Sequence, residues 1–190
     1  HTYYCAVTKR TGYIHFSAAY VQFGNTLYRQ QSVIIGSSIV YKDRISIGLA
    51  VKHMSTHIKR YSSRADFRII PGVIVSLSKN LNLGLKTECR PDKPVTANRI
   101  TVHCGLEYYR SGSFSLFAEI HKQSAHAAEL RTGMEHLFCS IITLRWGYTP
   151  SPSAFSWGLG VVWNTLAVDY GLNCHPELGV SHFASLSFTL

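Results

Sequence analysis

Apolar and polar residues alternate with a period of two along most of this chain. In residues 44–52, Ile45, Ile47, Leu49 and Val51 alternate with charged or small residues. Successive side chains of a β-strand point to opposite faces, so this pattern predicts a strand with one apolar and one polar face. The same alternation recurs in residues 72–78, 81–86, 99–108, 155–163 and 165–171.

Extending the pattern along the chain predicts strands joined by short hairpin turns. The candidate strands cover residues 2–9, 12–23, 28–41, 44–55, 67–78, 81–89, 98–110, 113–122, 126–137, 140–149, 154–163, 165–173 and 180–190. Turns such as Tyr41-Lys42-Asp43-Arg44 have the length of hairpin connections. Two longer polar stretches, 55–66 and 90–98, are predicted to be loops.

This pattern predicts one all-β domain over residues 1–190, with no helix and no linker. We expect a closed antiparallel transmembrane barrel. Bacterial single-chain barrels have even strand counts, so one N-terminal candidate should be spurious and about twelve strands remain, with ten or fourteen as alternatives.

The hydropathy of the chain excludes membrane-spanning helices but permits a membrane-spanning barrel. The mean hydropathy is +0.03. The longest apolar stretches, Val33 to Ile39 and Phe155 to Trp163, are interrupted by Gly and Ser and fall short of the about 20 residues that a spanning helix needs. A transmembrane barrel needs only alternating segments of about 10 residues.

The polar positions favour a membrane barrel over a soluble one, because they combine charges with glycine. A narrow lumen filled by opposed Arg and Glu would need small neighbours beside the long charged side chains. The predicted lumen network is Arg44, Arg99, Glu107, Glu119, Glu129, Arg131, Glu135, Arg145 and Asp169. The residues predicted to face lipid are Ile45, Ile47, Leu49, Val51, Val73, Val75, Trp157, Leu159, Val161, Leu166 and Val168. A charge on the lipid side would cost about 2–4 kcal/mol at mid-membrane for Arg or Lys.

Aromatic residues and the C-terminus supply two further indications of an outer-membrane barrel. Aromatic residues on the predicted outer face are typical of the girdles at the lipid–water interface. The candidates for these girdles are Tyr108, Trp146, Tyr148, Trp157, Trp163 and Tyr170. In the last strand Leu186, Phe188 and Leu190 alternate with hydroxyl residues, which resembles the signal read by outer-membrane assembly machinery.

Charge, cysteines and histidines suggest no other class of function. The net charge is +9, but the basic residues are scattered singly, unlike a nucleic-acid-binding patch. Five cysteines occur without a CxxC pair. His53 and His57 would share a helix face, but their segment is predicted to be a strand, so we expect no metal and no cofactor. No leader resembling a signal peptide begins at His1, so an exported protein would have lost it.

The C-terminal third resembles a known family. The runs are Glu129-Leu130-Arg131-Thr132-Gly133-Met134-Glu135-His136, Leu144-Arg145-Trp146-Gly147-Tyr148, Trp157-Gly158-Leu159-Gly160, Val168-Asp169-Tyr170 and Glu177-Leu178-Gly179-Val180-Ser181-His182. In order and spacing they are similar to the closing strands of the PorV/PorQ group of FadL-like outer-membrane barrels. Residues 31–89 match more loosely. The resemblance implies an outer-membrane location and an association with type IX secretion.

The sequence leaves more than one function open. The resemblance implies an N-terminal hatch that carries an Asn-Pro-Ala-like segment, but no such segment occurs in this sequence. This difference and the charge-filled lumen favour a non-enzymatic, structural or accessory subunit of a larger outer-membrane complex, with outer-membrane lipid and other outer-membrane proteins as its partners. A FadL-like transporter of hydrophobic or small solutes is the alternative, by family analogy. No nucleophile-elbow or metal motif indicates an enzyme. A soluble, lipocalin-like barrel would bury its apolar residues, whereas a membrane barrel would leave them exposed.

Overall fold

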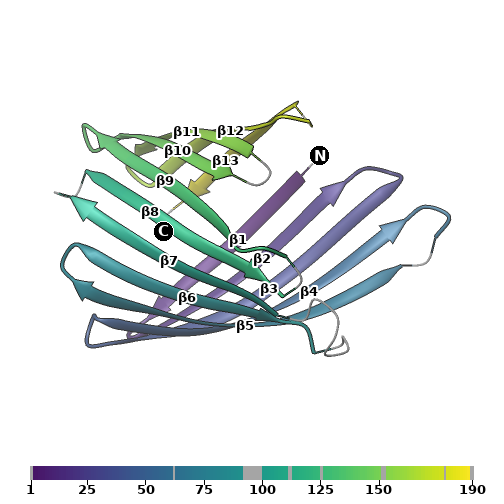
Figure 1. Ribbon diagram of the computed structural model, residues 1–190, viewed down its shortest axis with the longest axis horizontal. Helices are drawn as coiled ribbons and strands as arrows, with labels where there is room; N and C mark the ends of the chain where they lie inside the picture. The colour runs from purple at the N-terminus through teal and green to yellow at the C-terminus, as the bar shows by residue number, and fades with distance from the viewer. Residues whose placement is uncertain are drawn as a thin grey trace. The chain divides into compact units, whose positions relative to one another are not determined.

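The computed structural model folds the chain into strands that pair with their neighbours in sequence (Figure 1). It describes residues 2–61, 63–91, 100–110, 113–124, 126–150, 153–177 and 179–188. The strands are β1 (Thr2–Thr11), β2 (Ile14–Gly24), β3 (Tyr28–Tyr41), β4 (Ile45–Ile58), β5 (Arg64–Ser78), β6 (Leu81–Cys89), β7 (Ile100–Arg110), β8 (Phe114–Gln123), β9 (Glu129–Phe138), β10 (Ile142–Pro150), β11 (Ser153–Trp163), β12 (Leu166–His175) and β13 (Gly179–Phe188). The predicted all-β, antiparallel fold is confirmed.

The strand count corrects the prediction of twelve. The described residues form thirteen strands in the order β1 to β13. Every range read from the alternation overlaps one of them, so discarding an N-terminal candidate was wrong. The even-count rule applies to closed barrels, whereas β1 is a full strand paired with β2 from Thr2↔Phe23 to Thr11↔Ile14. In the described part β1 and β13 stand at the two ends of the order, and closure into a barrel stays a prediction.

The polar stretch 55–66, predicted to be a loop, is mostly strand. β4 continues to Ile58 and β5 begins at Arg64. Within the stretch, Thr56 pairs with Gln30 on one side and with Arg64 on the other. A ladder is held by backbone groups, so polar side chains do not end it when both neighbouring strands are present. The other predicted loop, 90–98, falls largely outside the described residues.

The connections differ in length between the two ends of the strands. At one end, here called the turn end, every connection has two or three residues, namely 12–13, 42–44, 79–80, 111–113, 139–141 and 164–165. At the other end, the loop end, the connections have from two to ten residues. Short turns on one side and longer loops on the other are typical of outer-membrane barrels.

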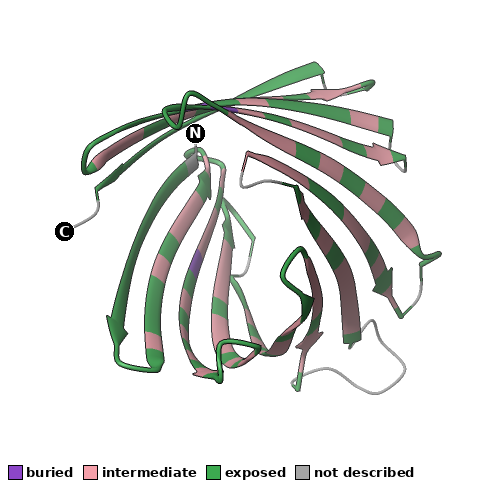
Figure 2. Cartoon of the chain, turned by 90° about the vertical axis from the view of Figure 1, so that its left-hand side faces the viewer, coloured by how far each residue is buried: buried purple, intermediate pink, exposed green. Residues whose placement is uncertain are grey.

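By its contacts the chain divides into two compact units. The first comprises His1–Ser76, Gly84–His103 and Gln123–His126, and the second Leu77–Leu83, Cys104–Lys122 and Ala127–Leu190. No described hydrophobic side chain of either unit is buried; Ile35 and Ile47, for example, are each 62% exposed. Along many strands exposed residues alternate with half-buried ones (Figure 2). Among the described residues, no helix has the length and apolar character needed to cross a membrane. A single domain over 1–190 stays a prediction.

Candidate functional site

Two chemically different faces run through the strands, and the pairing registers keep them in phase. Lys52 lies opposite Arg68 and Gly48 opposite Gly72, so polar and small positions of β4 meet those of β5. In β8 and β9, Glu119 lies opposite Arg131 in the same way. We call the face that carries these residues the polar face, and the opposite one the apolar face.

All seven carboxylates within the described strands are on the polar face. They are Asp66, Glu88, Glu107, Glu119, Glu129, Glu135 and Asp169. The apolar face of the described strands carries the cations Lys9, Arg29, Arg110 and Lys122, each near a strand end, and no carboxylate. Negative charge is therefore confined to one face of the described strands.

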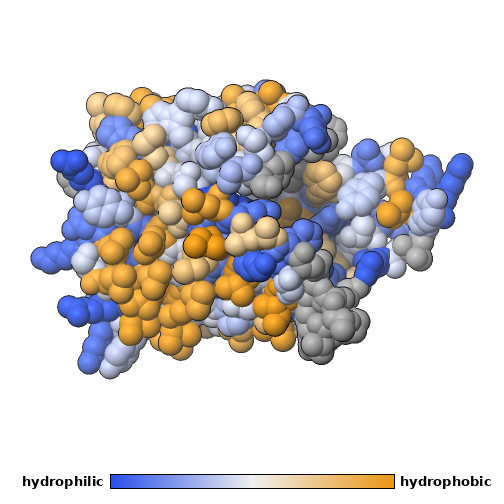
Figure 3. Space-filling view, in the orientation of Figure 1, coloured by the Kyte–Doolittle hydropathy of each residue, from blue (hydrophilic) through white to orange (hydrophobic). Residues whose placement is uncertain are grey.

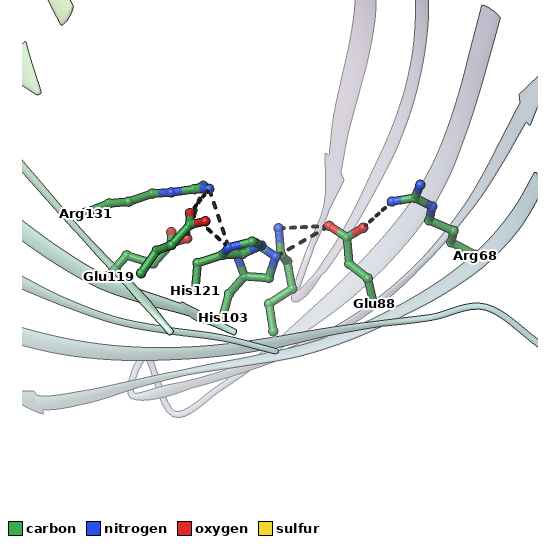
Figure 4. A network of polar contacts seen from close by, with 8 residues as sticks. Arg68, Glu88, His103, Glu119, His121 and Arg131 are labelled. Atoms are coloured by element: carbon green, nitrogen blue, oxygen red, sulfur yellow. Dashed lines mark hydrogen bonds and ion pairs between the residues drawn. The ribbon is translucent and has the colours of Figure 1, made fainter. Parts of the chain in front are cut away.

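The first unit holds a cluster of ion pairs on the polar face of β5 and β6 (Figure 4). The Arg68 guanidinium lies 3.1 Å from Asp66 and 3.0 Å from Glu88. Lys86 lies 3.4 Å from Glu88, and Arg90 3.5 Å from Asp66. These residues, together with His103 at 3.7 Å from Glu88, form what we call the β5–β6 cluster.

The β5–β6 cluster carries an excess of positive charge. Lys52 projects from β4 opposite Arg68 and adds a fourth cation beside two carboxylates. The side chains of Arg68 and Asp66 are only 16% and 12% exposed. Partly buried charges are stable only when paired, so the two carboxylates hold the surrounding cations together.

The second unit holds another group of charges on β8 and β9. Arg131 lies 3.2 Å from Glu129 and 3.9 Å from Glu119. The Nδ1 atom of His121 lies 3.5 Å from both Glu129 and Arg131. Figure 4 shows the side chains of Glu119, His121 and Arg131 on the same side of their strands. In this group, the β8–β9 cluster, two carboxylates share one arginine.

A third group, the β9–β12 cluster, places Arg145 between two carboxylates. Its Nε donates to Glu135 at 2.7 Å, and its Nη1 donates to Asp169. Glycine makes this arrangement possible, because a Cβ on Gly160 would lie 2.6 Å from Asp169 Oδ1 and 3.2 Å from Arg145 Nη1. Gly160 therefore leaves the room that the Arg145 and Asp169 side chains occupy, as expected for small residues beside long charged ones.

A carboxylate with uncharged hydrogen-bonding neighbours lies between β6 and β7. Asn82 donates its Nδ2 to Glu107 and to the Tyr109 hydroxyl, each at 3.2 Å. The Tyr109 N–H donates to the carbonyl of Asn80, in the turn before β6, at 2.8 Å. Glu107 thus has a hydrogen-bonding partner other than a cation.

Most residues of the predicted lumen network fall into these groups. Glu119, Glu129 and Arg131 meet in the β8–β9 cluster. Glu135, Arg145 and Asp169 meet in the β9–β12 cluster, and Glu107 is held by Asn82. Arg44 lies instead in the turn before β4, exposed, and its N–H donates to the Tyr41 carbonyl. Arg99 lies outside the described residues. That these residues line a lumen stays a prediction.

Sequence reasoning missed the β5–β6 cluster entirely. Its signal was present in the alternating charges at positions 64, 66 and 68 and again at 86, 88 and 90. The first set was overlooked because residues 55–66 were predicted to be a loop. In a loop, alternating charges do not indicate which side chains share a face. The second set stands at the loop end of β6, beyond the apolar residues that mark its strand.

The predicted interface aromatics occupy different heights on the apolar face. Tyr108 and Trp163 lie near the turn end and Tyr148 near the loop end. Trp146 and Trp157 form an edge-to-face pair at mid-strand, with centroids 5.8 Å apart, and Tyr170 is also at mid-strand. Leu186 and Phe188 are exposed on the apolar face of β13, and Leu190 lies outside the described residues. Their roles at the interface and in assembly stay predictions.

The chemistry of the polar face is that of paired charges. Among the described residues no group of three or more His, Cys, Asp and Glu is placed to hold a metal ion. The five cysteines are free thiols and none forms a disulfide. The polar face can therefore interact with water and ions through its Arg, Lys, Asp and Glu side chains.

Comparison with solved structures places the fold among porins. Three substituted variants of the Rh. blastica porin are similar over 98% of this chain and 89% of their own length, with TM-scores of 0.53 to 0.54 and 9–10% sequence identity. At this identity the likeness concerns the fold alone. No protein-family model matches the chain, and no curated protein matches its sequence. The class defined by these findings is a porin-like antiparallel β-fold; the narrower PorV/PorQ resemblance stays a hypothesis.

Proposed function

We propose that this chain is a β-barrel protein of an outer membrane, and that its polar face lines a channel for small, charged or polar solutes. One observation carries the proposal. The described strands bury no hydrophobic side chain, yet they confine all their carboxylates to one face. A sheet in water must bury its apolar face against another layer, whereas a sheet in a bilayer turns that face toward lipid.

The lengths of the strands support a membrane location. The thirteen strands have from nine to fifteen residues. A transmembrane strand needs about 9–11 residues when tilted by about 45°. Each described strand is therefore long enough to cross the apolar layer, and β3 to β5 exceed the requirement.

The chemistry of the polar face supports a channel. An apolar solute would have to remove water from the side chains of Arg68, Arg131 and Arg145 and from their carboxylate partners, at a high cost. Ions and small polar solutes keep part of their hydration beside such side chains. The porin-like fold belongs to barrels whose larger members, with about 16–18 strands, enclose an aqueous channel.

A second candidate function is a non-conducting accessory subunit of a larger outer-membrane complex. The mutual pairing of charges in the β5–β6, β8–β9 and β9–β12 clusters favours it, because long side chains held in pairs on the polar face would fill a narrow lumen. The protein would then act through its outer surface, and its partners would be other outer-membrane proteins. A type IX secretion complex is the assembly that the PorV/PorQ resemblance suggests.

Conductance distinguishes the two candidates. The purified protein, inserted into a planar bilayer in 1 M KCl, where the Debye length is about 3 Å, should give stable, uniform conductance steps. The matched variant is Gly105→Arg, which adds a long side chain to the polar face where a new Cβ would meet only a backbone oxygen at 3.6 Å, and it should reduce the step size. A bilayer that stays silent, with a protein that co-purifies in a larger complex from mild detergent, would favour the accessory subunit.

A further inference from the structure

The side chains on the apolar face of β2–β5 become more polar, row by row, toward the loop end. The first of these cross-strand rows consists of Tyr20, Val33, His53 and Phe67, which lie opposite one another in neighbouring strands. On the turn-end side of this row the face of β4 carries Ile45, Ile47, Leu49 and Val51. The row therefore marks the end of the continuous apolar band.

The next row forms hydrogen bonds instead of apolar contacts. Gln22, Gln31 and Ser55 lie opposite one another. The Gln31 amide donates to the Tyr20 hydroxyl at 2.9 Å and to Gln22 Oε1 at 3.2 Å. Groups of this kind match the ester and glycerol level of a lipid leaflet, where acceptors and water are available.

Beyond this row the face is cationic. Arg29 lies opposite His57, both exposed, and Lys59 and Arg60 follow in the connection to β5. The Lys59 N–H donates to the Leu27 carbonyl at 2.8 Å, which ties the two connections together at this height. We call Arg29, Lys59 and Arg60 the cationic rim.

No carboxylate lies on this face of β2–β5, so the charge of the rim is uncompensated there. Asp66, the nearest acidic residue in sequence, is on the polar face and paired with Arg68. In Figure 3 the end of the β4–β5 hairpin, which projects at the right as in Figure 1, is largely hydrophilic, whereas apolar side chains gather nearer the turn end.

The spacing of the rows agrees with the dimensions of a leaflet. From His53 to His57 the strand advances four residues, which is about 9 Å along the membrane normal at about 3.3 Å per residue and a tilt of about 45°. The headgroup region adds about 5–8 Å on each side of the hydrocarbon core. The backbone of the cationic rim therefore lies at the outer edge of the headgroup region, from which long Arg and Lys side chains reach the lipid phosphates.

We infer that the loop end of β2–β5 binds the phosphate groups of anionic lipid headgroups through the cationic rim. The inference rests on the proposed membrane location and adds the chemistry of the lipid. The occupant is a phosphorylated, negatively charged lipid, because the face offers cations and hydrogen-bond donors directly above an apolar band. Each Lys or Arg near an anionic surface contributes about 1 kcal/mol, or about fivefold in binding.

A Val33→Trp reporter, in a chain whose Trp146, Trp157 and Trp163 are replaced by Phe, tests this inference in reconstituted vesicles. Val33 is 42% exposed on the boundary row. The vesicles contain phosphatidylcholine with a minor share of phosphatidylglycerol, and bromine is placed on the acyl chains of one lipid or the other. Bromine quenches a nearby indole, so the two series report which lipid contacts the reporter. The expected result is stronger quenching by brominated phosphatidylglycerol than its share of the bilayer predicts.

Matched variants separate the rim from general charge. Arg29→Gln with Lys59→Gln should reduce the phosphatidylglycerol preference by about fivefold for each cation. Arg64→Gln, a cation at the same end of β5 but on the polar face, should leave it unchanged. Ile35→Trp, deeper in the apolar band, serves as a second reporter if Val33→Trp does not fold.

The outcomes are distinct. Equal quenching by the two brominated lipids overturns the inference while supporting the membrane location, because the reporter then contacts lipid without selecting its headgroup. Quenching by neither lipid overturns the proposed membrane location itself. Loss of the preference in Arg64→Gln to the same extent as in the rim variant also overturns the inference, since net charge alone would then explain it.

Discussion

At the scale of single residues, the arrangement on the polar face depends on glycine as much as on charge. Gly160 lies on β11 against the Arg145–Asp169 pair, and its missing side chain leaves the space that the pair occupies. Gly105 lies on β7 with only a backbone oxygen, at 3.6 Å, close to where a Cβ would be. The two glycines share a strand conformation but differ in what surrounds them, so they can be compared directly.

We expect Gly160→Ala to destabilise the fold. The added Cβ would lie 2.6 Å from Asp169 Oδ1 and force the carboxylate away from Arg145. Overpacking of this kind costs about 1–3 kcal/mol. The measurement is the free energy of unfolding in urea, followed by tryptophan fluorescence in lipid vesicles. Gly105→Ala is the control and should be neutral or slightly stabilising; equal losses in both variants would contradict the steric argument.

The acidic partners of Arg145 should influence ion selectivity if the polar face lines a channel. Glu135→Gln combined with Asp169→Asn removes two negative charges around Arg145 and leaves the guanidinium without ionised partners. The reversal potential in a salt gradient should then shift toward anion preference. Glu177→Gln, an exposed change between β12 and β13, is the control. An unchanged reversal potential in the double variant would argue against a lumen position for this cluster.

At the scale of elements, the length of a strand and the length of its apolar segment are separate properties. The backbone pairing of β3, β4 and β5 continues through residues whose side chains are polar on both faces, such as Ser55 and Thr56. Side-chain polarity reports the surroundings of a strand, whereas the ladder depends on its neighbours. This difference is why residues 55–58 resemble a loop in sequence and form a strand in the fold.

Hydrogen exchange tests the extended strands directly. Amides of β4 between His53 and Ile58 that take part in the ladders to β3 and β5 should exchange as slowly as those of residues 45–51. The exposed connecting residues Lys59 to Tyr61 supply the comparison and should exchange faster overall, because the hydrogen bonds of Lys59 and Tyr61 lie outside the strand ladders. Rapid exchange throughout 53–58 would mean that the strand ends with the apolar band.

The turns carry strain that substitution can relieve. Cys139 and Ser140 have φ values of 49° and 57°, in the left-handed region that disfavours residues other than Gly, Asn and Asp. Cys139→Asn with Ser140→Gly should therefore raise the free energy of unfolding by about 1–2 kcal/mol. The matched opposite change is Gly12→Ala at φ +60°, which should lower stability although nothing lies within 4 Å of the new Cβ. Denaturant unfolding of the unsubstituted chain and the two variants measures whether each change raises or lowers the free energy of unfolding.

At the scale of the whole molecule, closure is the property on which the proposed function depends. Each antiparallel pairing reverses the direction of the chain, so a direct pairing of β13 with β1 would be parallel. We predict that the protein in detergent resists dodecyl sulfate at room temperature and migrates differently on a gel before and after boiling, as closed barrels without free edges do. Identical migration under both conditions would count against a closed barrel.

Much of the local structure follows from the sequence, because alternation has a direct physical cause. A strand that separates lipid from polar groups must alternate, so Ile45 to Val51 predict both a strand and its two faces. The hairpin turns follow equally, since consecutive strands with short connections pair as neighbours. Alternation also predicted that Arg145 and Asp169 share a face, although they are distant in sequence.

Which charges meet was decided only by the tertiary structure. The register is the alignment of one strand with the next. A shift of the register by two residues would leave each side chain on the same face but would change the residue opposite it in the neighbouring strand. The sequence therefore indicates that Glu119, Arg131, Glu135 and Arg145 share a surface, while the ladders alone bring Arg131 to Glu119 and Arg145 to Glu135 and Asp169. The β5–β6 cluster and the cationic rim depend on strands that continue past their apolar residues, because backbone pairing between neighbours, and not hydropathy, determines where a strand ends.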